Sequence, residues 1–211
     1  GFDNLITLVQ KGDIIYVPAG EYTDSLTISV NNVKIYGPNF GVKGNETRKD
    51  EAVFKGVITL AENVKGFTFD GCKVDGEYQL LLSNGNADVT FQNNVLGATS
   101  KDGMINLQAG SVSNLVANYN FGEAYQSSRF IRTEKNTVVD GFTTIGNDIT
   151  GTALHYDFLN CQGMLKGKVV IADNKFVNSQ QSFIYVISVG LIDCLISGNY
   201  VESAANTIID F

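Results

Sequence analysis

A short asparagine-centred motif recurs along most of this 211-residue chain. In each copy an apolar residue is followed by two spacers, an asparagine, one spacer and an apolar or small residue. Successive copies stand 22, 26, 27, 27 and 25 residues apart. A loose period of this size is typical of a solenoid, in which each repeat stacks on its neighbours. From the first copy to the last, the central residues are Cys72, Asn94, Asn120, Asn147, Asn174 and Asn199.

The segments between the asparagines indicate strands rather than helices. Short runs rich in Val, Ile, Phe, Tyr and Thr alternate over a few residues, as at 169–171 and 183–187. Apolar residues at sustained helical spacing are absent, and so is the frame of leucine-rich repeats. The sequence therefore predicts an all-β fold, a single-stranded parallel β-helix of about seven coils spaced roughly 4.8 Å apart.

The recurring asparagine predicts a ladder of stacked side chains at one turn of every coil. An amide there can bond both the turn backbone and the amide of the next coil. Asparagine also tolerates the left-handed backbone that such turns require. The predicted ladder consists of Asn94, Asn120, Asn147, Asn174 and Asn199.

The N-terminus predicts a short capping helix within residues 1–12. Asp3 is a suitable N-cap and Gly12 a suitable stop, so the helix is expected over residues 3–11. A β-helix leaves its first coil with an open apolar end that an amphipathic helix can cover. The apolar side chains expected on the covering face are Leu5, Leu8 and Val9.

Three motifs follow this cap: GDIIYVPAGEY at 12–22, VKIYGPN at 33–39 and EAVFKGVITL at 51–60. This run resembles the opening of pectate-lyase-like right-handed parallel β-helix proteins, most specifically over residues 1–76. The resemblance implies a right-handed coil and is closest to secreted or surface domains of bacterial proteins. It leaves function open, because that superfamily includes lyases, hydrolases, esterases, epimerases and adhesins.

One insertion interrupts the coil period. Ile35 and Phe69 hold equivalent positions but stand 34 residues apart, and the extra segment is residues 39–52. Its positive and negative charges balance, so we expect a solvated polar loop, with one wall of a groove as the alternative. The whole of 1–211 is expected to form one domain of a longer polypeptide. Because the chain ends in a strand-like run, a further domain or another chain is expected to cover that end.

Composition argues against several classes of partner. The net charge is −7 and no basic patch is interleaved with aromatic residues, so no nucleic-acid partner is expected. No run of eighteen apolar residues is present, so no membrane span is expected. The three cysteines, Cys72, Cys161 and Cys194, lack zinc-site spacing, and no metal site is predicted.

The resemblance also indicates where to look for a binding site. Family members that act on polysaccharides use the outer face of the first strand of each coil. Those strands are predicted near 78–82, 104–108, 130–133, 153–158, 183–187 and 207–210. Strand alternation points one row of polar side chains outward. The row contains Asn106, Arg132, His155 and Asp157, with Gln79 and Tyr185 as further substrate-binding candidates.

The leading hypothesis for this row is a polysaccharide- or glycan-binding surface, without catalysis or cofactor, on a secreted or cell-surface bacterial protein. Hydrogen bonds and ring stacking could hold an acidic or neutral sugar chain. The second hypothesis is a uronate lyase, often assisted by Ca²⁺. In it, Arg132 neutralises the substrate carboxylate, His155 or Tyr185 abstracts a proton, and Asp157 orients His155 or binds metal. The third is a structural stalk or adhesin segment without a site.

The known catalytic motifs of this superfamily are absent from the chain. The motifs of polygalacturonases, the aspartate pair and arginine of pectin methylesterases, and the calcium-binding aspartates of pectate lyases are not found. A glycosidase of this fold would place carboxylates on consecutive coils of one face, and none are seen there. The residue types alone therefore leave the three hypotheses open.

Overall fold

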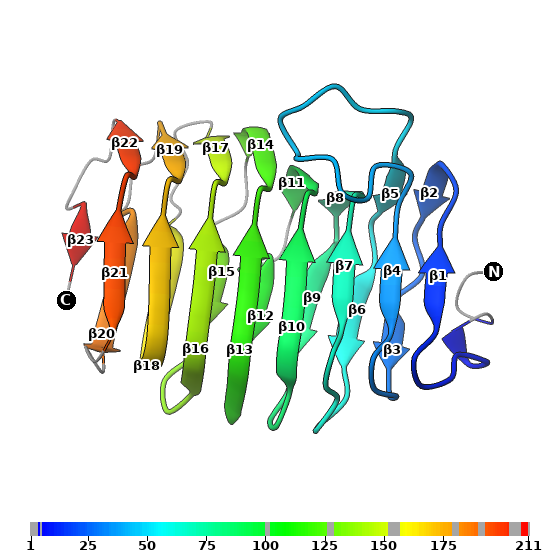
Figure 1. Cartoon of the computed structure of the whole chain (residues 1–211), viewed down its shortest axis with the longest axis horizontal. Helices are drawn as coiled ribbons and strands as arrows, with labels where there is room; N and C mark the ends of the chain where they lie inside the picture. The colour runs from blue at the N-terminus through cyan, green and yellow to red at the C-terminus, as the bar shows by residue number, and fades with distance from the viewer. Residues whose placement is uncertain are drawn as a thin grey trace.

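The computed structural model describes residue 4 and residues 6–99, 102–125, 129–151, 157–178, 182–189, 193–202 and 208–210. These residues form an all-β parallel solenoid, as the sequence predicts (Figure 1). Every strand pair in it is parallel, because successive coils stack in the same direction. No helix within the described ranges is long and apolar enough to cross a bilayer.

Each coil contributes strands to three faces. The first face stacks β1 (Ile14–Tyr16), β4 (Lys34–Tyr36), β7 (Thr68–Asp70), β10 (Ala87–Gln92), β13 (Ser111–Asn118), β16 (Val138–Ile145), the end of β18 (Asp157–Ala172) and β21 (Cys194–Ser197). The second stacks β2 (Gly20–Tyr22), β5 (Ala52–Phe54), β8 (Lys73–Gly76), β11 (Val95–Thr99), β14 (Phe121–Tyr125), β17 (Asp148–Gly151), β19 (Lys175–Val177) and β22 (Tyr200–Glu202). The third stacks β3 (Leu26–Ile28), β6 (Val57–Leu60), β9 (Gln79–Leu82), β12 (Ile105–Leu107), β15 (Arg129–Thr133), the start of β18, β20 (Ile184–Val189) and β23 (Ile209–Asp210).

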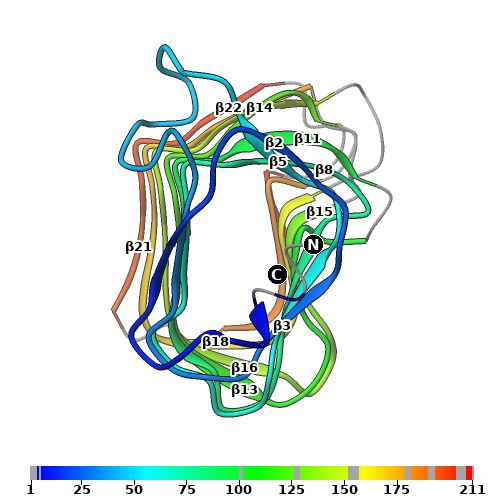
Figure 2. The same cartoon turned by 90° about the vertical axis from the view of Figure 1, so that its right-hand side faces the viewer.

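The coil is right-handed. In Figure 2 the N-terminal end is nearest the viewer, and the chain runs up the first face, across β2 and down through β3 before repeating further away. Within the described residues eight strands stack in the second face, one level more than the predicted seven or so coils. Strand β18 differs from the others because it turns the corner without a break and belongs to both the third and the first faces.

Inward side chains form one continuous core along the solenoid axis. On the third face, Leu80, Ile105 and Ile131 are register partners on neighbouring coils, and all three are buried. On the first face, the rings of Phe69 and Phe91 stack with their centroids 5.6 Å apart. Parallel stacking therefore buries each coil against both of its neighbours, which is where most of the hydrophobic stabilisation arises.

Stacked asparagines line the turn between the first and second faces. The Oδ1 atom of Asn120 accepts a hydrogen bond from the Asn94 backbone N–H at 3.0 Å, and the same bond recurs between Asn147 and Asn120 at 3.0 Å. Asn174 and Asn199 continue the ladder towards the C-terminus. At its other end the N–H of Cys72 donates to Asn94 Oδ1, so the buried cysteine ends the ladder without extending it.

The sequence predicts a left-handed backbone at the ladder asparagine, but the structure places it at the preceding residue. In the structure the residue before each ladder asparagine has a positive φ, such as 56° at Tyr119 and 54° at Asp173. At the corresponding place before Asn147 and Asn199 the chain has glycine, Gly146 and Gly198. The ladder asparagine is therefore selected for its inward hydrogen bonds, and its neighbour absorbs the unusual backbone.

The predicted N-terminal helix over 3–11 is too long. Among the described residues, only Asn4 and Ile6 have helical backbone, and a turn follows at residues 7–8. Ile6 and Val9 pack against the core, whereas Leu8 is largely exposed and was wrongly placed on the covering face. Asp3 and Leu5 lie outside the described residues. The short turn still lies at the N-terminal end of the first coil (Figure 2).

Most charged side chains of residues 39–52 are exposed, as their charge balance predicts, but Arg48 is not. This segment, here called the strap, rises above the solenoid over the turns that carry the ladder (Figure 1). Its Arg48 side chain is only 8% exposed and pairs with Glu51. The same guanidinium donates to the carbonyl oxygens of Val42, Asn93 and Cys72. A buried arginine with that many acceptors ties the strap to the coils beneath it.

Asp70 provides a second anchor for the strap. Its buried carboxylate accepts hydrogen bonds from the Gly41 N–H and from the side chains of Gln92 and Asn93, all between 2.8 and 3.0 Å. Further along, the Gly44 N–H donates to the Tyr119 carbonyl at 2.9 Å. The strap therefore contacts several consecutive coils and is part of the packed structure.

Candidate functional site

The outer side of the third face carries a row of register-paired side chains. Asn106 on β12 pairs with Arg132 on β15, which pairs with Asn160 on β18 and then Tyr185 on β20. Sequence alternation predicted the outward direction of Asn106 and Arg132. It placed Asp157 in the same row, whereas the structure pairs Asp157 with Arg129. His155 lies outside the described residues.

Strand corners explain that difference. Phe130 and Ile131 are both fully buried although they are neighbours on β15, and Phe158 and Leu159 repeat this on β18. Two consecutive inward residues break strict alternation, so the outward residues are three apart. Arg129 and Arg132 therefore face the same side, as do Asp157 and Asn160, and strict period-2 reasoning missed both Arg129 and Asn160 as members of the site.

Two arginines and two carboxylates form the accessible part of the site, here called the charged rim. Arg129 Nη1 donates to Asp102 Oδ1 at 2.5 Å, and Arg132 Nη1 pairs with the other oxygen of the same carboxylate. Arg132 Nη2 also pairs with Glu134 at 2.8 Å. The Asp102 side chain is 46% exposed, and Arg132 is 17% exposed. The rim thus carries two positive and two negative charges, all of them partnered.

Beneath the rim lies a floor of nearly buried polar side chains: Gln79, Asn106, Asp157 and Asn160. Asn160 Nδ2 donates to Asp157 Oδ2 at 2.7 Å, and Gln79 Nε2 donates to the Gly103 carbonyl at 2.7 Å. The sequence identified Gln79 and Asn106 as substrate-binding candidates, but the structure buries both. Both side chains donate to backbone carbonyl groups in the segment that carries Asp102.

Asn106 Oδ1 and Arg132 Nε are buried at this site and have no hydrogen-bond partner among the described residues. They belong to register-paired residues on adjacent strands. One is an acceptor and the other a donor, so a single hydroxyl or water could satisfy both. Buried polar groups without partners are costly and uncommon in folded proteins, and functional sites are one of the places where they occur.

Burial raises the pKa of the Asp157 carboxyl above its ordinary value. Its side chain is almost fully covered, and desolvation disfavours the charged form. Hydrogen bonding to Asn160 and the charge of Arg129, whose Nε lies 3.4 Å from Asp157 Oδ2, act in the opposite direction without cancelling that effect. Burial therefore favours the protonated form of Asp157 more than it would for an exposed carboxyl.

The approach of Gly103 to Arg132 was not visible in the sequence. Gly103 has a φ of +90°, and a Cβ there would lie 2.7 Å from Arg132 Cβ. Glycine therefore permits the segment carrying Asp102 to approach β15. Asp102 itself precedes its strand and belongs to no repeat, so no periodic signal could have identified it.

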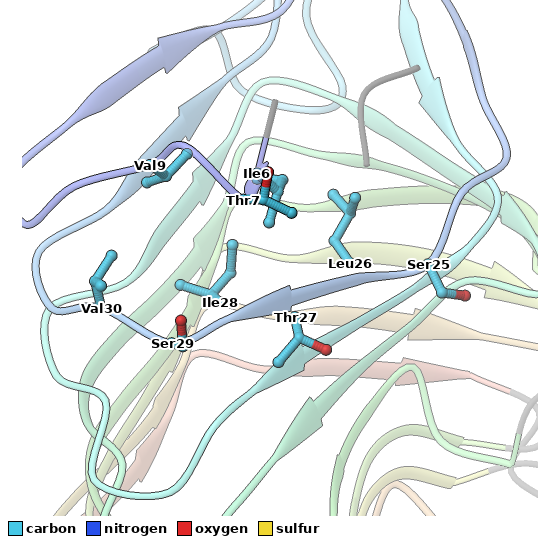
Figure 3. Close-up of a pocket in the computed structure, with 9 residues that line it drawn as sticks. All are labelled: Ile6, Thr7, Val9, Ser25, Leu26, Thr27, Ile28, Ser29 and Val30. Atoms are coloured by element: carbon cyan, nitrogen blue, oxygen red, sulfur yellow. The ribbon is translucent and has the colours of Figure 1, made fainter. Parts of the chain in front are cut away.

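A hollow at the N-terminal end of the solenoid is of a different kind. A space of about 460 Å³ lies between the N-terminal turn and β3 (Figure 3). Ile6, Val9 and Ile28 border it, while the side chain of Thr27 points away from it. Its described lining includes no charged group, so it resembles a gap in core packing more than a site for chemistry.

Within the part of the chain that the structure describes, no group of three His, Cys, Asp or Glu side chains is placed to hold a metal ion. Burial raises the pKa of the thiols of Cys72 and Cys161, which makes them poor nucleophiles.

Comparisons with known proteins do not identify a family for this fold and site. No family model, no curated protein and no solved structure matches the chain. The fold and the site described above therefore carry the functional argument.

Proposed function

We propose that the outer side of the third face binds a neutral, hydroxyl-rich carbohydrate chain without chemically altering it. The observation that carries this proposal is the charged rim, in which Asp102 holds Arg129 and Arg132 together beside Glu134. A sugar hydroxyl donates and accepts hydrogen bonds at once. A rim that offers fixed guanidinium donors next to fixed carboxylate acceptors complements such groups.

Charge balance favours a neutral chain over an acidic one. Each rim arginine already faces a carboxylate, and Asp157 adds a further acid in the floor. The whole chain carries a net charge of −7. An acidic sugar would have to displace Asp102 from both arginines and would meet long-range repulsion as well.

The row continues along the solenoid axis, which suits an extended ligand. Beyond Arg132 it reaches Asn160 and the partly exposed Tyr185. Gln162 lies next to Asn160 and donates to its Oδ1 at 3.2 Å. Neighbouring strands are about 4.8 Å apart, so successive coils would present polar groups at regular intervals to successive sugar residues.

Kinship with the pectate-lyase-like superfamily, and a secreted or cell-surface location in bacteria, form part of this proposal. Support comes from the opening motifs at 12–22 and 33–39 together with the right-handed parallel coil. In that superfamily the same outer face holds polysaccharide, which agrees with the position of the charged rim.

A polysaccharide lyase is the second candidate, and one observation favours it. Asp157 is an acid of raised pKa beside Arg129, as a proton-transferring carboxyl would be. If the protein is a lyase that uses Asp157, uronate polymers incubated with it will give the ultraviolet absorbance of the unsaturated product, and Asp157→Asn will abolish it. No absorbance with wild-type protein would exclude this candidate for the polymers tested.

The binding proposal is tested by affinity electrophoresis in gels containing neutral polysaccharides, with polygalacturonate as the acidic comparison. We expect retardation in at least one neutral gel, and at least a tenfold weaker interaction for Arg132→Ala. The control is Asp140→Asn, which removes an exposed partner of Lys166 on the first face. Unretarded migration of the wild type in every neutral gel would contradict the proposal and favour a structural stalk.

A further inference from the structure

A second group of side chains on the surface has no part in the site described above. Tyr16 on β1 and Tyr36 on β4 are register partners on the outer side of the first face, and Phe40 of the strap lies beside them. Tyr16 is 64% exposed and Phe40 47% exposed. Large aromatic rings that gather on a surface mark a binding site more often than isolated exposed residues do.

The three rings meet as two walls of a corner. Tyr36 and Phe40 are stacked, with ring centroids 5.0 Å apart and planes inclined by 7°. Tyr16 stands edge-on to both of them, at interplanar angles of 65° and 67° and centroid distances of 5.8 Å. We call Tyr16, Tyr36 and Phe40 the aromatic corner.

The aromatic corner is held in place before any ligand arrives. The Phe40 N–H donates to the Gly37 carbonyl, and the next residue, Gly41, donates to the buried Asp70 carboxylate at 3.0 Å. A Cβ on Gly71 would lie 2.0 Å from the Phe40 backbone nitrogen, so the strap sits directly against the coil. Because these groups are already ordered, binding should cost little further conformational entropy, which favours affinity.

A hollow of about 450 Å³ lies against these rings. The strap forms one wall of this hollow through Lys49 and Asp50. This position agrees with the alternative expectation that the insertion borders a groove. Lys49 is fixed through its backbone, because its N–H donates to Asn39 Oδ1 at 2.7 Å and its carbonyl accepts from Asn39 Nδ2. A mostly apolar hollow with a few oriented polar groups is the usual form of a small-ligand site.

We propose that the aromatic corner is a second, independent binding site that takes one pyranose ring of a neutral sugar chain. The apolar C–H face of a pyranose can stack on an exposed ring, while its hydroxyls reach outward. Lys49 supplies donors and Asp50 acceptors for those hydroxyls. Their charges cancel, so the corner offers an acidic sugar no net attraction.

The two sites lie on different sides of the solenoid. Figure 2 shows the face that ends in β21, to which β1 and β4 belong, across the coil interior from the face of β3 and β15. A loss of binding at one site should therefore leave the other unaffected. This separation makes failure of the aromatic corner distinguishable from failure of the charged rim.

The test titrates the full chain with cellohexaose, xylohexaose and mannohexaose, and follows ligand saturation-transfer signals by NMR. We expect Tyr16→Ala to weaken binding of at least one of these at least tenfold at this site, while Tyr16→Phe, which keeps the ring, retains it. Tyr200→Ala, which removes a comparably exposed tyrosine near the other end, should have no effect.

Arg132→Ala separates the two proposals. Binding that survives Arg132→Ala and is lost in Tyr16→Ala supports the aromatic corner even if the charged rim binds nothing. Binding that survives Tyr16→Ala in the Arg132→Ala background overturns the proposal, and so does the absence of binding to all three oligosaccharides. Tyr16-dependent binding of a proline-rich peptide in place of the sugars would also overturn it, since such segments dock on aromatic-lined grooves.

Discussion

Two arginines, Arg48 in the strap and Arg132 in the charged rim, show how differently the same side chain is used in this protein. Arg48 is buried and bonds backbone carbonyls of consecutive coils, so its partners cannot leave without unfolding the strap. Arg132 is held by two carboxylates at the surface, and its Nε has no partner within the part of the chain that the structure describes. An arginine bonded to backbone carbonyls holds the fold together, whereas one held by partly exposed side chains can exchange these partners for a ligand.

Two buried acids differ in the same way. Asp70 accepts three hydrogen bonds from the strap and the neighbouring coil. Asp157 lies under the rim with Asn160 and Arg129, and its pKa is raised. The first acid connects two parts of the chain, and burial favours the protonated form of the second.

Removing each arginine in turn should give the largest difference in the free energy of unfolding. Arg48→Ala leaves Glu51 and several carbonyl groups without their partner, and we expect it to lower the free energy of unfolding by about 3 kcal/mol. Arg132→Ala should cost about 1 kcal/mol or less, as for other partly exposed ion pairs. Urea denaturation of both variants measures the difference, and equal losses would contradict the distinction.

The asparagine ladder should show a smaller effect that depends on position. Asn147 Nδ2 donates to the Ala117 carbonyl and to Asn174 Oδ1, and its Oδ1 accepts from Asn120, so Asn147→Ala should cost about 2 kcal/mol. Asn199, at the last rung among the described residues, bonds Asn174 and the Ile171 carbonyl. Asn199→Ala should therefore cost less. Thermal unfolding of both variants gives the order, and a larger loss for Asn199→Ala would argue against a cooperative ladder.

The charge balance of the rim predicts a change in ligand preference. Asp102→Asn removes the carboxylate shared by Arg129 and Arg132 and leaves a net positive rim. We expect the affinity for polygalacturonate to rise about tenfold, equivalent to about 1.4 kcal/mol, while affinity for neutral chains falls. Calorimetric titration with both polymers, with Asp140→Asn as the control, measures the change. An unchanged preference would show that Asp102 does not select the ligand.

The smallest expected effect concerns pH. Because the pKa of Asp157 is higher in the folded chain than in the unfolded one, the folded state binds more protons between the two values. Stability should therefore fall as the pH rises from about 3.9 through the raised value, and that cost stays at higher pH. Asp157→Asn should reduce this slope. Melting temperatures across this pH range compare the two proteins, and parallel curves would assign the pH dependence to other groups.

Much of the fold could be predicted because it is local and periodic. Short strands, the recurring asparagine and the opening motifs all predict a parallel solenoid, and each coil repeats the same requirement. The predictions from sequence fail where the coil repeat is interrupted. The predicted helix over 3–11 is too long. The charges of the strap predict a solvated loop, but they do not reveal the buried acceptors around Arg48.

The site was predictable only in part. Alternation placed Asn106 and Arg132 in one row, and the structure makes them register partners, but alternation could not anticipate the paired inward residues at Phe130 and Ile131. Asp102 gave no signal at all, because it stands outside the repeats.

The sequence by itself determined that this chain coils in parallel and stacks its coils on an asparagine ladder, since a repeated local pattern has one way to bury its apolar side along an axis. Only the tertiary structure decided which polar residues meet. Arg129 and Asp157 are 28 residues apart, yet strand register places them side by side. Register depends on loop lengths and corners summed over a whole coil, and no local pattern in the sequence records that sum.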